Sequence, residues 1–451
     1  MPRGTDLLQR LWSKSENPDE QPLPDDLSSI EASQILEARV EKRKRELGPE
    51  HPDTLVGMNN LAFSYWKQGR WKEAEKLQLH VIESRKRVLG PEHPQTLSTM
   101  ASLGFGYWNE GQCKEAEELQ VYVLEKRKRL LGPEHSETLE IMNNLVCTYL
   151  DQGRFREAEE LQTEEFELSS RVHGRDHPDT LISMGNLAST YTKQGKWAEA
   201  ESLQKKVIEL YSQSLGGKHP STLDSMAELA SIYQEQERWK EALDLNFQVM
   251  KARKEVLGPD HPDTLGAMSS LSSIYREQER WEEAERIDVQ VAEAIMELFG
   301  PEHPKTLVSM SNLGSTYHGQ KRFDEAAAVQ EQVVHISIEL RGPNHPSTLT
   351  DMANLGCTYR GQGRMEEAES LEQVVMEARR QVLGPEHPDT VTSMNNLAFT
   401  FKASGKNEEA LLLIGKCVEI LNKSLGPDHP RTIHAAAALT EWRKTHASGS
   451  I

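Results

Sequence analysis

Apolar residues recur along the chain with a period of 42 residues, and each period contains two stretches with helical spacing. In the first period the apolar positions from Leu55 to Tyr65 lie three or four residues apart, as on one face of a helix. A second stretch with the same spacing runs from Trp71 to Val88. The pattern predicts two helices in every period, and therefore an all-α fold of tandem helix pairs.

Ten histidines mark the boundaries between periods. They are His51, His93, His135, His177, His219, His261, His303, His345, His387 and His429, and each precedes proline except His135, which precedes Ser136. Proline suits the first turn of a helix, where its missing N–H costs no hydrogen bond. Histidines one whole repeat apart cannot converge on one zinc ion. We therefore interpret them as residues that cap or pack the turn between repeats, and we expect no metal site.

Several positions of the repeat are nearly constant within this one chain. Leucine occupies one position in all nine periods, from Leu61 to Leu397, and alanine occupies another, from Ala74 to Ala410. Tyrosine and methionine recur at two further positions. We predict that these residues form the core, in which each repeat packs against its neighbours.

Charge and hydropathy fit such an array. The chain has 451 residues, of which 37% are hydrophobic, and a mean hydropathy of −0.65, which is low for a thick globular core but suits a solenoid. Its 52 Lys and Arg against 71 Asp and Glu give a net charge of −19. An acidic chain is repelled by nucleic acid and by anionic membranes, so we expect neither as a partner.

The cysteines and the hydropathy profile favour a cytoplasmic location. None of the four cysteines, Cys113, Cys147, Cys357 and Cys417, has the spacing of a metal site or of a secreted disulfide framework. We find no apolar run long enough for a membrane span, and the first residues have no apolar core of a signal peptide.

The repeat resembles a known family. The order Met58, Leu61, Ala62, Tyr65 and Ala74 is similar to the tetratricopeptide repeat (TPR). The 42-residue length, with Leu-Gly-Pro-Glu-His-Pro between repeats, resembles the repeats of kinesin light chains. The resemblance implies a right-handed superhelical α-solenoid. One departure is glutamine at a position that is aromatic in the family, at Gln78, Gln120, Gln162, Gln204 and Gln330.

The same register predicts the organisation of the chain. We expect a disordered tail over residues 1–27, a capping helix and turn over 28–50, and nine repeats over 51–428. A second capping helix is expected over 429–445, followed by a tail over 446–451. The stretch before the repeats is too short and too rich in proline for the long heptad segment of kinesin light chains.

No catalytic motif accompanies the repeats. The chain lacks a phosphate-binding Gly-x-x-x-x-Gly-Lys-Ser/Thr loop, a Gly-x-Ser-x-Gly motif and a His-Glu-x-x-His motif. We therefore expect no enzyme activity and no cofactor, and interpret the chain as a scaffold or adaptor for protein binding. The alternatives are a sensor array that acts with a separate signalling NTPase, and a non-catalytic specificity subunit of an enzyme complex.

In the resembled family the first helix of each repeat lines a concave groove, and asparagine there binds the backbone of an extended peptide. The matching asparagines are Asn60, Asn144, Asn186, Asn312, Asn354 and Asn396. An amide offers both a donor and an acceptor, as a peptide bond requires. The alternative is that these asparagines bond a neighbouring helix of the same chain.

A second position on the first helix changes character along the chain. It is aromatic at Trp66 and Trp108, near Phe63 and Phe105, and basic at Arg276, His318, Arg360 and Lys402. We predict that it binds a peptide with apolar or aromatic and acidic residues. The alternative is a surface without a ligand. The acidic tail with Trp12 is a candidate to mask the groove, and the sequence favours no particular oligomeric state.

Overall fold

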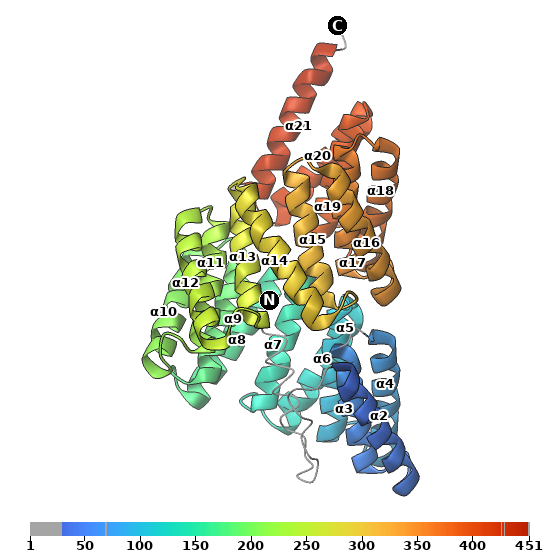
Figure 1. The fold of residues 1–451 in the computed structure, drawn as a ribbon. Coiled ribbons are helices and arrows are strands. Elements are labelled where there is room, and N and C mark those ends of the chain that lie inside the picture. The colour runs from blue at the N-terminus through green and yellow to red at the C-terminus, as the bar shows by residue number, and fades with distance from the viewer. Residues whose placement is uncertain (1–28, 68–69, 425, 428, 450–451) are drawn as a thin grey trace. The chain divides into compact units, whose positions relative to one another are not determined.

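The regular secondary structure of the described residues is all helical. The computed structural model describes residues 29–67, 70–424, 426–427 and 429–449, and these form twenty α-helices and no strand (Figure 1). The helices are α2 (Ser29–Glu46), α3 (Pro52–Lys67), α4 (Trp71–Val88), α5 (Pro94–Asn109), α6 (Cys113–Leu130), α7 (Ser136–Asp151), α8 (Phe155–His173), α9 (Pro178–Lys193), α10 (Trp197–Ser214), α11 (Pro220–Glu235), α12 (Trp239–Leu257), α13 (Pro262–Glu277), α14 (Trp281–Phe299), α15 (Pro304–Gly319), α16 (Phe323–Arg341), α17 (Pro346–Gly361), α18 (Met365–Val382), α19 (Pro388–Ala403), α20 (Asn407–Ser424) and α21 (Pro430–Gly449). The predicted tail over residues 1–27 lies outside the described residues.

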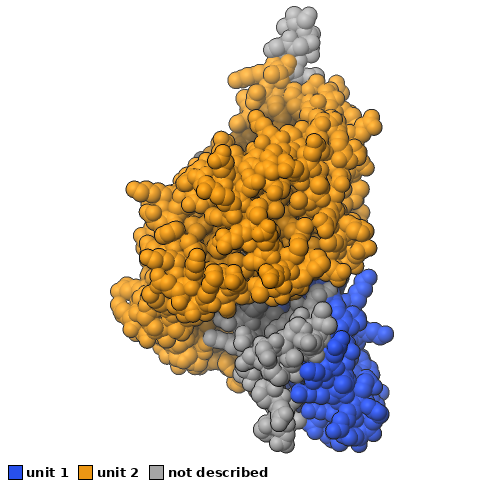
Figure 2. Space-filling model, viewed as in Figure 1, with its two compact units in different colours: residues 1–130 blue, residues 131–451 orange. Residues whose placement is uncertain are grey.

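The chain divides into two compact units, Met1–Leu130 and Leu131–Ile451 (Figure 2). If the repeats are numbered from His51, unit 1 holds repeats 1 and 2, and unit 2 holds repeats 3 to 9 and α21. Within each unit every helix packs against the helix that follows it. The predicted all-α solenoid of helix pairs is therefore confirmed.

In unit 2 the first helices of the repeats lie closest to one another. Neighbouring first helices touch, as α7 touches α9 and α15 touches α17, whereas the second helices that the structure describes make no contact of that extent with each other. The first helices thus form the more closely spaced layer of unit 2. A solenoid curves toward its closer layer, so this layer faces inward.

The boundary histidines cap the first helices, as predicted. In all ten, Nδ1 accepts a hydrogen bond from the backbone N–H two residues later, over 3.1–3.3 Å. One of the N–H groups that a helix start leaves without a partner is thereby satisfied. The cap requires a neutral imidazole with its proton on Nε2.

A second recurrent turn joins the two helices of each repeat. In repeat 5 the backbone N–H of Arg238 donates to the carbonyl of Tyr233 over 2.8 Å, and its guanidinium lies 4.2 Å from the centre of the tyrosine ring. The same contacts recur with Arg70, Arg154, Lys196, Arg280, Arg322, Arg364 and Lys406. One residue in this turn has a left-handed backbone, and it is glycine in several repeats but Glu237, Glu279 and Lys321 in repeats 5 to 7.

The constant positions form the core. All nine alanines of the column that begins with Ala74 are completely buried, because the two helices of a repeat cross at that point. The leucine column from Leu61 is buried as well, except for half-buried Leu313. The column of Gln78 is also buried, so a row of polar side chains runs through the core beside the alanines.

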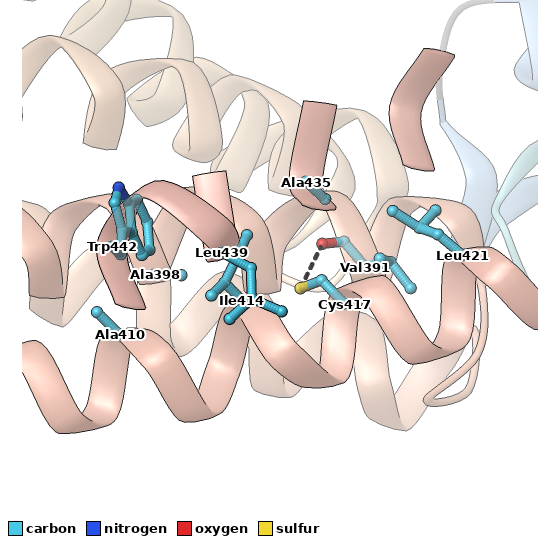
Figure 3. Packing of buried hydrophobic residues seen from close by; sticks show 9 residues of the cluster. All are labelled: Val391, Ala398, Ala410, Ile414, Cys417, Leu421, Ala435, Leu439 and Trp442. Carbon is cyan, nitrogen blue, oxygen red and sulfur yellow. Dashed lines mark hydrogen bonds between the residues drawn. The ribbon is translucent and has the colours of Figure 1, made fainter. Parts of the chain in front are cut away.

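The last helix, α21, closes unit 2. Its residues Leu439 and Trp442 cover Ile414 and Cys417 of α20 (Figure 3). Arg443, at the tyrosine position of this incomplete repeat, is exposed. The helix continues to Gly449, four residues beyond the predicted end at 445, because residues 446–448 include neither proline nor glycine. Among the described residues, no helix is long and apolar enough to cross a membrane.

Candidate functional site

The predicted asparagines fall into two groups. Asn60 and Asn144 are buried, whereas Asn186, Asn312, Asn354 and Asn396 are half-buried. The amide of Asn186 donates to Asn143 Oδ1 over 3.1 Å, and that of Asn354 donates to Ser311 Oγ over 3.4 Å. These two bonds join first helices of neighbouring repeats, which is the alternative role considered above. The side chains of Asn312 and Asn396 have no hydrogen-bond partner among the described residues.

The two arginines of the basic column are held by buried carboxylates. Arg276 Nη1 lies 3.0 Å from Oδ2 of Asp288, and Thr316 of the next repeat donates to the same oxygen over 2.6 Å. Asp288 is only 2% exposed. Arg360 Nη1 lies 3.1 Å from Oε1 of the equally buried Glu372.

The arginine pairs also join successive repeats. Arg360 Nη1 donates to the carbonyl of Asn396 over 3.1 Å and to Thr400 Oγ1 over 2.8 Å, both in the following repeat. Each guanidinium is therefore fixed in place, and its charge is balanced within the protein. The side chains remain partly reachable, with 16% exposure for Arg276 and 24% for Arg360.

His318 and Lys402, the other two members of the basic column, have different surroundings. His318 Nδ1 is hydrogen-bonded to Thr358 Oγ1 over 3.1 Å, and its ring packs edge-on against Phe323. Burial, together with the charge of Arg360, lowers the pKa of His318 and so disfavours its charged form. Lys402 Nζ donates to Asn407 Oδ1 over 2.9 Å and lies near the ring of Trp442.

Sequence reasoning missed the carboxylates that balance the arginines. Asp288 and Glu372 lie twelve residues after their arginines, in the column that is otherwise mostly glutamine. Acidic residues appear in that buried column only in the two repeats with arginine at the earlier position. That coincidence was the available signal. The predicted basic stripe is thus a row of ion pairs and polar contacts.

The aromatic residues of unit 1 are mostly packed inside it. Trp66 is 7% exposed, donates from Nε1 to Gln78 Oε1 over 3.0 Å, and lies 5.3 Å from Trp71 between ring centres. Its ring lies directly over Gly106 of the next repeat, where a Cβ atom would come within 2.2 Å of it. Trp66 therefore acts at the junction between repeats 1 and 2.

The other three aromatic residues form a smaller group in unit 1. Phe105 is buried against Trp108, with 5.2 Å between ring centres. Trp108 and Phe63 are half-buried. These two side chains are the predicted aromatic residues of unit 1 that a ligand can reach.

A buried glutamate is the second feature that sequence reasoning missed. Glu165 is 2% exposed in α8, at a position that is valine in seven other repeats. Ser183 Oγ donates to its Oε1 over 2.7 Å, and Gln162 Nε2 donates to its Oε2 over 2.8 Å. In the sequence, the only indication was that Glu165 replaces the valine found at this position in most other repeats.

No cluster of three or more His, Cys, Asp and Glu in the described ranges could hold a metal ion. Burial raises the pKa of the Cys147 and Cys417 thiols to about 12 and also raises that of Cys357, so these thiols stay protonated.

Three solved structures illustrate what the chain resembles. A Podosopora anserina structure of kinesin-light-chain nearly identical TPR-like repeats is 31% identical; the match covers 46% of this chain and 97% of that one, with a TM-score of 0.39. The apo quorum sensor NprR from B. thuringiensis is 13% identical over 82% of this chain and 99% of that one, with a TM-score of 0.51. A signal-transduction ATPase with a tetratricopeptide-repeat sensor from Pyrococcus horikoshii is 14% identical over 99% of this chain and 65% of that one, with a TM-score of 0.46.

Family models give the clearest result. No curated protein sequence matches the chain significantly. A tetratricopeptide-repeat model matches residues 53–121, 102–169, 148–212, 185–255, 227–290 and 263–339, and a second one matches 348–389 and 390–431. Together these matches span nearly all nine repeats. The chain therefore belongs to the tetratricopeptide-repeat family, with repeats of the kinesin-light-chain type.

Proposed function

We propose that the chain is a non-catalytic scaffold whose first helices bind an extended, acidic peptide segment of a partner protein. The observation that carries the proposal lies in repeats 6 to 9 of unit 2. The half-buried amides of Asn312 and Asn396, which have no side-chain partner among the described residues, share the inner helix layer with the fixed guanidiniums of Arg276 and Arg360.

The amides suit the backbone of the peptide. A carboxamide can accept from one peptide N–H and donate to a peptide carbonyl. Because Asn312 and Asn396 lie at the same position of repeats 7 and 9, 84 residues apart, they offer two such points to an extended chain. The first helices that carry them, α15 and α19, both belong to the inner layer of unit 2.

The arginines suit acidic side chains of the peptide. The described hydrogen bonds of Arg276 all run from Nη1, to Ser272 Oγ and Asp288 Oδ2. Its Nε–Nη2 edge has no partner among the described residues, and this planar edge can bind a carboxylate through two parallel bonds. Because the guanidinium is already fixed by Asp288, little side-chain entropy is lost when a carboxylate binds.

Unit 1 has a separate role in the proposal. Its half-buried Phe63 and Trp108 offer apolar contacts to an aromatic or aliphatic side chain of a partner. This contribution is apolar, whereas that of unit 2 is polar.

The test compares wild type with a variant in which complete pairs are replaced, because reversal of an arginine alone would leave a buried carboxylate unpaired. Arg276→Gln with Asp288→Asn copies repeat 5, and Arg360→Thr with Glu372→Gln copies repeat 4. Partners are captured with each protein and identified by mass spectrometry, and their acidic peptides are then tested for binding. The fourfold variant should no longer bind those peptides.

Two controls make the result decisive. Circular dichroism should show equal helix content and an unfolding temperature close to that of wild type. An unchanged set of acidic partners in the folded variant would contradict recognition by Arg276 and Arg360. Capture of a signalling NTPase by both proteins, with no acidic segment bound, would instead favour a sensor array.

A further inference from the structure

Repeat 3 contains a carboxylic acid where the other repeats have a small apolar residue. The equivalent residues are Val81, Val123, Val207, Val249, Val291, Val333, Val375 and Cys417, and all are buried. Glu165 is buried to the same degree, and it makes no ion pair with a described residue. A buried carboxyl without a cation is costly unless hydrogen bonds satisfy it, so this position calls for an explanation.

Three polar side chains surround the carboxyl group. Ser183 of α9 donates to Oε1 and Gln162 of α8 donates to Oε2, while Asn143 of α7 provides a further side-chain hydrogen bond. The charged group that acts on Glu165 from the packed helices is the carboxylate of Asp179, in the first turn of α9. The site therefore satisfies the hydrogen-bonding capacity of the carboxylate without neutralising its charge.

The hydrogen bonds continue from Glu165 to the asparagine column. Gln162 Nε2 also donates to Asn143 Oδ1 over 3.0 Å, and the same oxygen accepts from Asn186 Nδ2 over 3.1 Å. Asn186 is one of the half-buried residues predicted to contact a peptide. Two amides thus connect a buried acid to the inner helix layer.

We propose that Glu165 is a proton-sensitive positioning residue for Asn186. When Glu165 is ionised, it accepts from Ser183 and Gln162, and these charge-assisted bonds fix the amide of Gln162 as a donor. Asn143 then presents its oxygen toward α9, and this oxygen holds the N–H₂ group of Asn186.

Protonation has a defined path in this geometry. When Oε1 is protonated, its O–H group donates a hydrogen bond to Ser183 Oγ. The Ser183 hydroxyl then turns to donate to the carbonyl of Asp179, which lies 3.0 Å from Oγ. The carboxyl group becomes neutral and the number of hydrogen bonds is kept. Because charge-assisted bonds are roughly twice as strong as neutral ones, Gln162 and Asn143 are then held more weakly. Asn143 consequently holds the amide of Asn186 less firmly.

The proton exchange falls in a physiological range. Burial raises the pKa of Glu165 to about 7, with a contribution from Asp179 and against the opposing effect of its hydrogen bonds. Both forms are therefore populated near neutral pH. If peptides bind the first helices as proposed above, binding at repeat 4 should be tighter at pH 8 than at pH 6; this consequence rests on the proposed function.

The experiment follows the side-chain amides directly, without a ligand. In full-length protein labelled with ¹⁵N-asparagine, the signals of Asn143 and Asn186, assigned with Asn143→Ser and Asn186→Ser, are recorded from pH 5.5 to 8.5. In wild type both should shift with a common midpoint near pH 7. In Glu165→Gln the shifts should be lost, and Glu160→Gln, an exposed change in the same helix, should titrate as wild type does.

Two outcomes would overturn the proposal: signals that do not titrate in wild type, or signals that still titrate in Glu165→Gln. If Glu165→Gln does not fold, Glu165→Val, which restores the residue of the neighbouring repeats, serves in its place. Peptide affinity at pH 6 and pH 8 is then measured separately. Absence of any peptide binding would count against the proposed function alone, since the amide titration does not depend on it.

Discussion

The same position of the repeat is held by different interactions in the two units, an aromatic contact in unit 1 and an ion pair in unit 2. In repeat 1 it is Trp66, which bonds Gln78 twelve residues later and lies over Gly106 of the next repeat. In repeat 6 it is Arg276, which bonds Asp288 twelve residues later, and Asp288 binds Thr316 of the next repeat. The comparison shows that the residue at this position bonds its own second helix, and that it or its bonded partner contacts the following repeat. A change there must therefore be matched at two other positions.

The largest loss of stability is expected when the carboxylate that pairs with Arg276 in repeat 6 is removed. Asp288→Ala leaves Arg276 largely buried without its counter-charge, and we expect it to destabilise unit 2 by about 3 kcal/mol. Arg276→Gln with Asp288→Asn, the combination found in repeat 5, should stay within about 1 kcal/mol of wild type. Urea unfolding followed by circular dichroism measures both. Equal stability of the single and double variants would show that the ion pair does not matter.

The corresponding test in unit 1 is steric. Gly106→Ala places a Cβ atom against the ring of Trp66, and we expect a loss of about 2 kcal/mol from overpacking. Trp66→Leu with Gly106→Thr reproduces Leu150 and Thr190 of repeats 3 and 4 and should recover most of that loss. Thermal unfolding of the three proteins gives the answer. No recovery in the double variant would mean that the junction depends on more than this pair.

A fall in pH should change the stability of the two units in opposite directions, through an acidic group in unit 1 and a basic group in unit 2. In unit 1, burial and the nearby Glu75 raise the pKa of Glu110 to about 7, so its folded form holds its proton more tightly than the unfolded one. Its stabilising effect is present at low pH and is lost as pH rises toward 7. In unit 2, burial lowers the pKa of His303 to about 4, so the stability from its neutral cap is lost as pH falls below 6.5.

Variants separate these two effects. The stability difference between wild type and Glu110→Gln should favour wild type more at pH 5 than at pH 7.5. The difference between wild type and His303→Asn, which keeps a cap that does not titrate, should change in the other direction. Unfolding temperatures measured from pH 4.5 to 7.5 test both slopes. Parallel slopes would contradict the assigned pKa shifts.

The smallest expected effects concern the turn inside the repeat. Unit 1 has Gly111 in the left-handed conformation, whereas unit 2 has glycine there in some repeats and Glu237, Glu279 and Lys321 in others, with φ of 57°, 57° and 62°. Side chains other than glycine are strained there, so Glu279→Gly should stabilise the protein by roughly 0.5–1 kcal/mol. Gly111→Ala should destabilise it by a similar amount. An unfolding temperature lowered by Glu279→Gly would show that the side chain compensates for the strain.

The sequence made the repetitive features predictable because nine copies reinforce each pattern. The helix pairs, the capping histidines and the buried alanine column follow from spacing and residue type alone. The pairing of Arg276 with Asp288 was harder to foresee, since it depends on how two helices cross. In the sequence, Arg276 resembles an exposed cation, and Asp288 is an acidic residue in a buried column that is mostly glutamine. Glu165 was missed for a related reason: it is a single exception in a column of valines, and its partners Ser183 and Asn143 lie on two other helices. The positions that depart from the repeat were thus the hardest to interpret.

The close fit of Trp66 over Gly106 has a consequence for how such an array can change. A repeat is often regarded as a module that can be moved, duplicated or deleted without regard to its neighbours. Here repeat 1 requires a successor with glycine at one position, and placing repeat 4 behind it would set Thr190 against the indole. The residue at this junction thereby restricts which repeat can follow repeat 1, so part of the order of the repeats is encoded in contacts between neighbouring repeats.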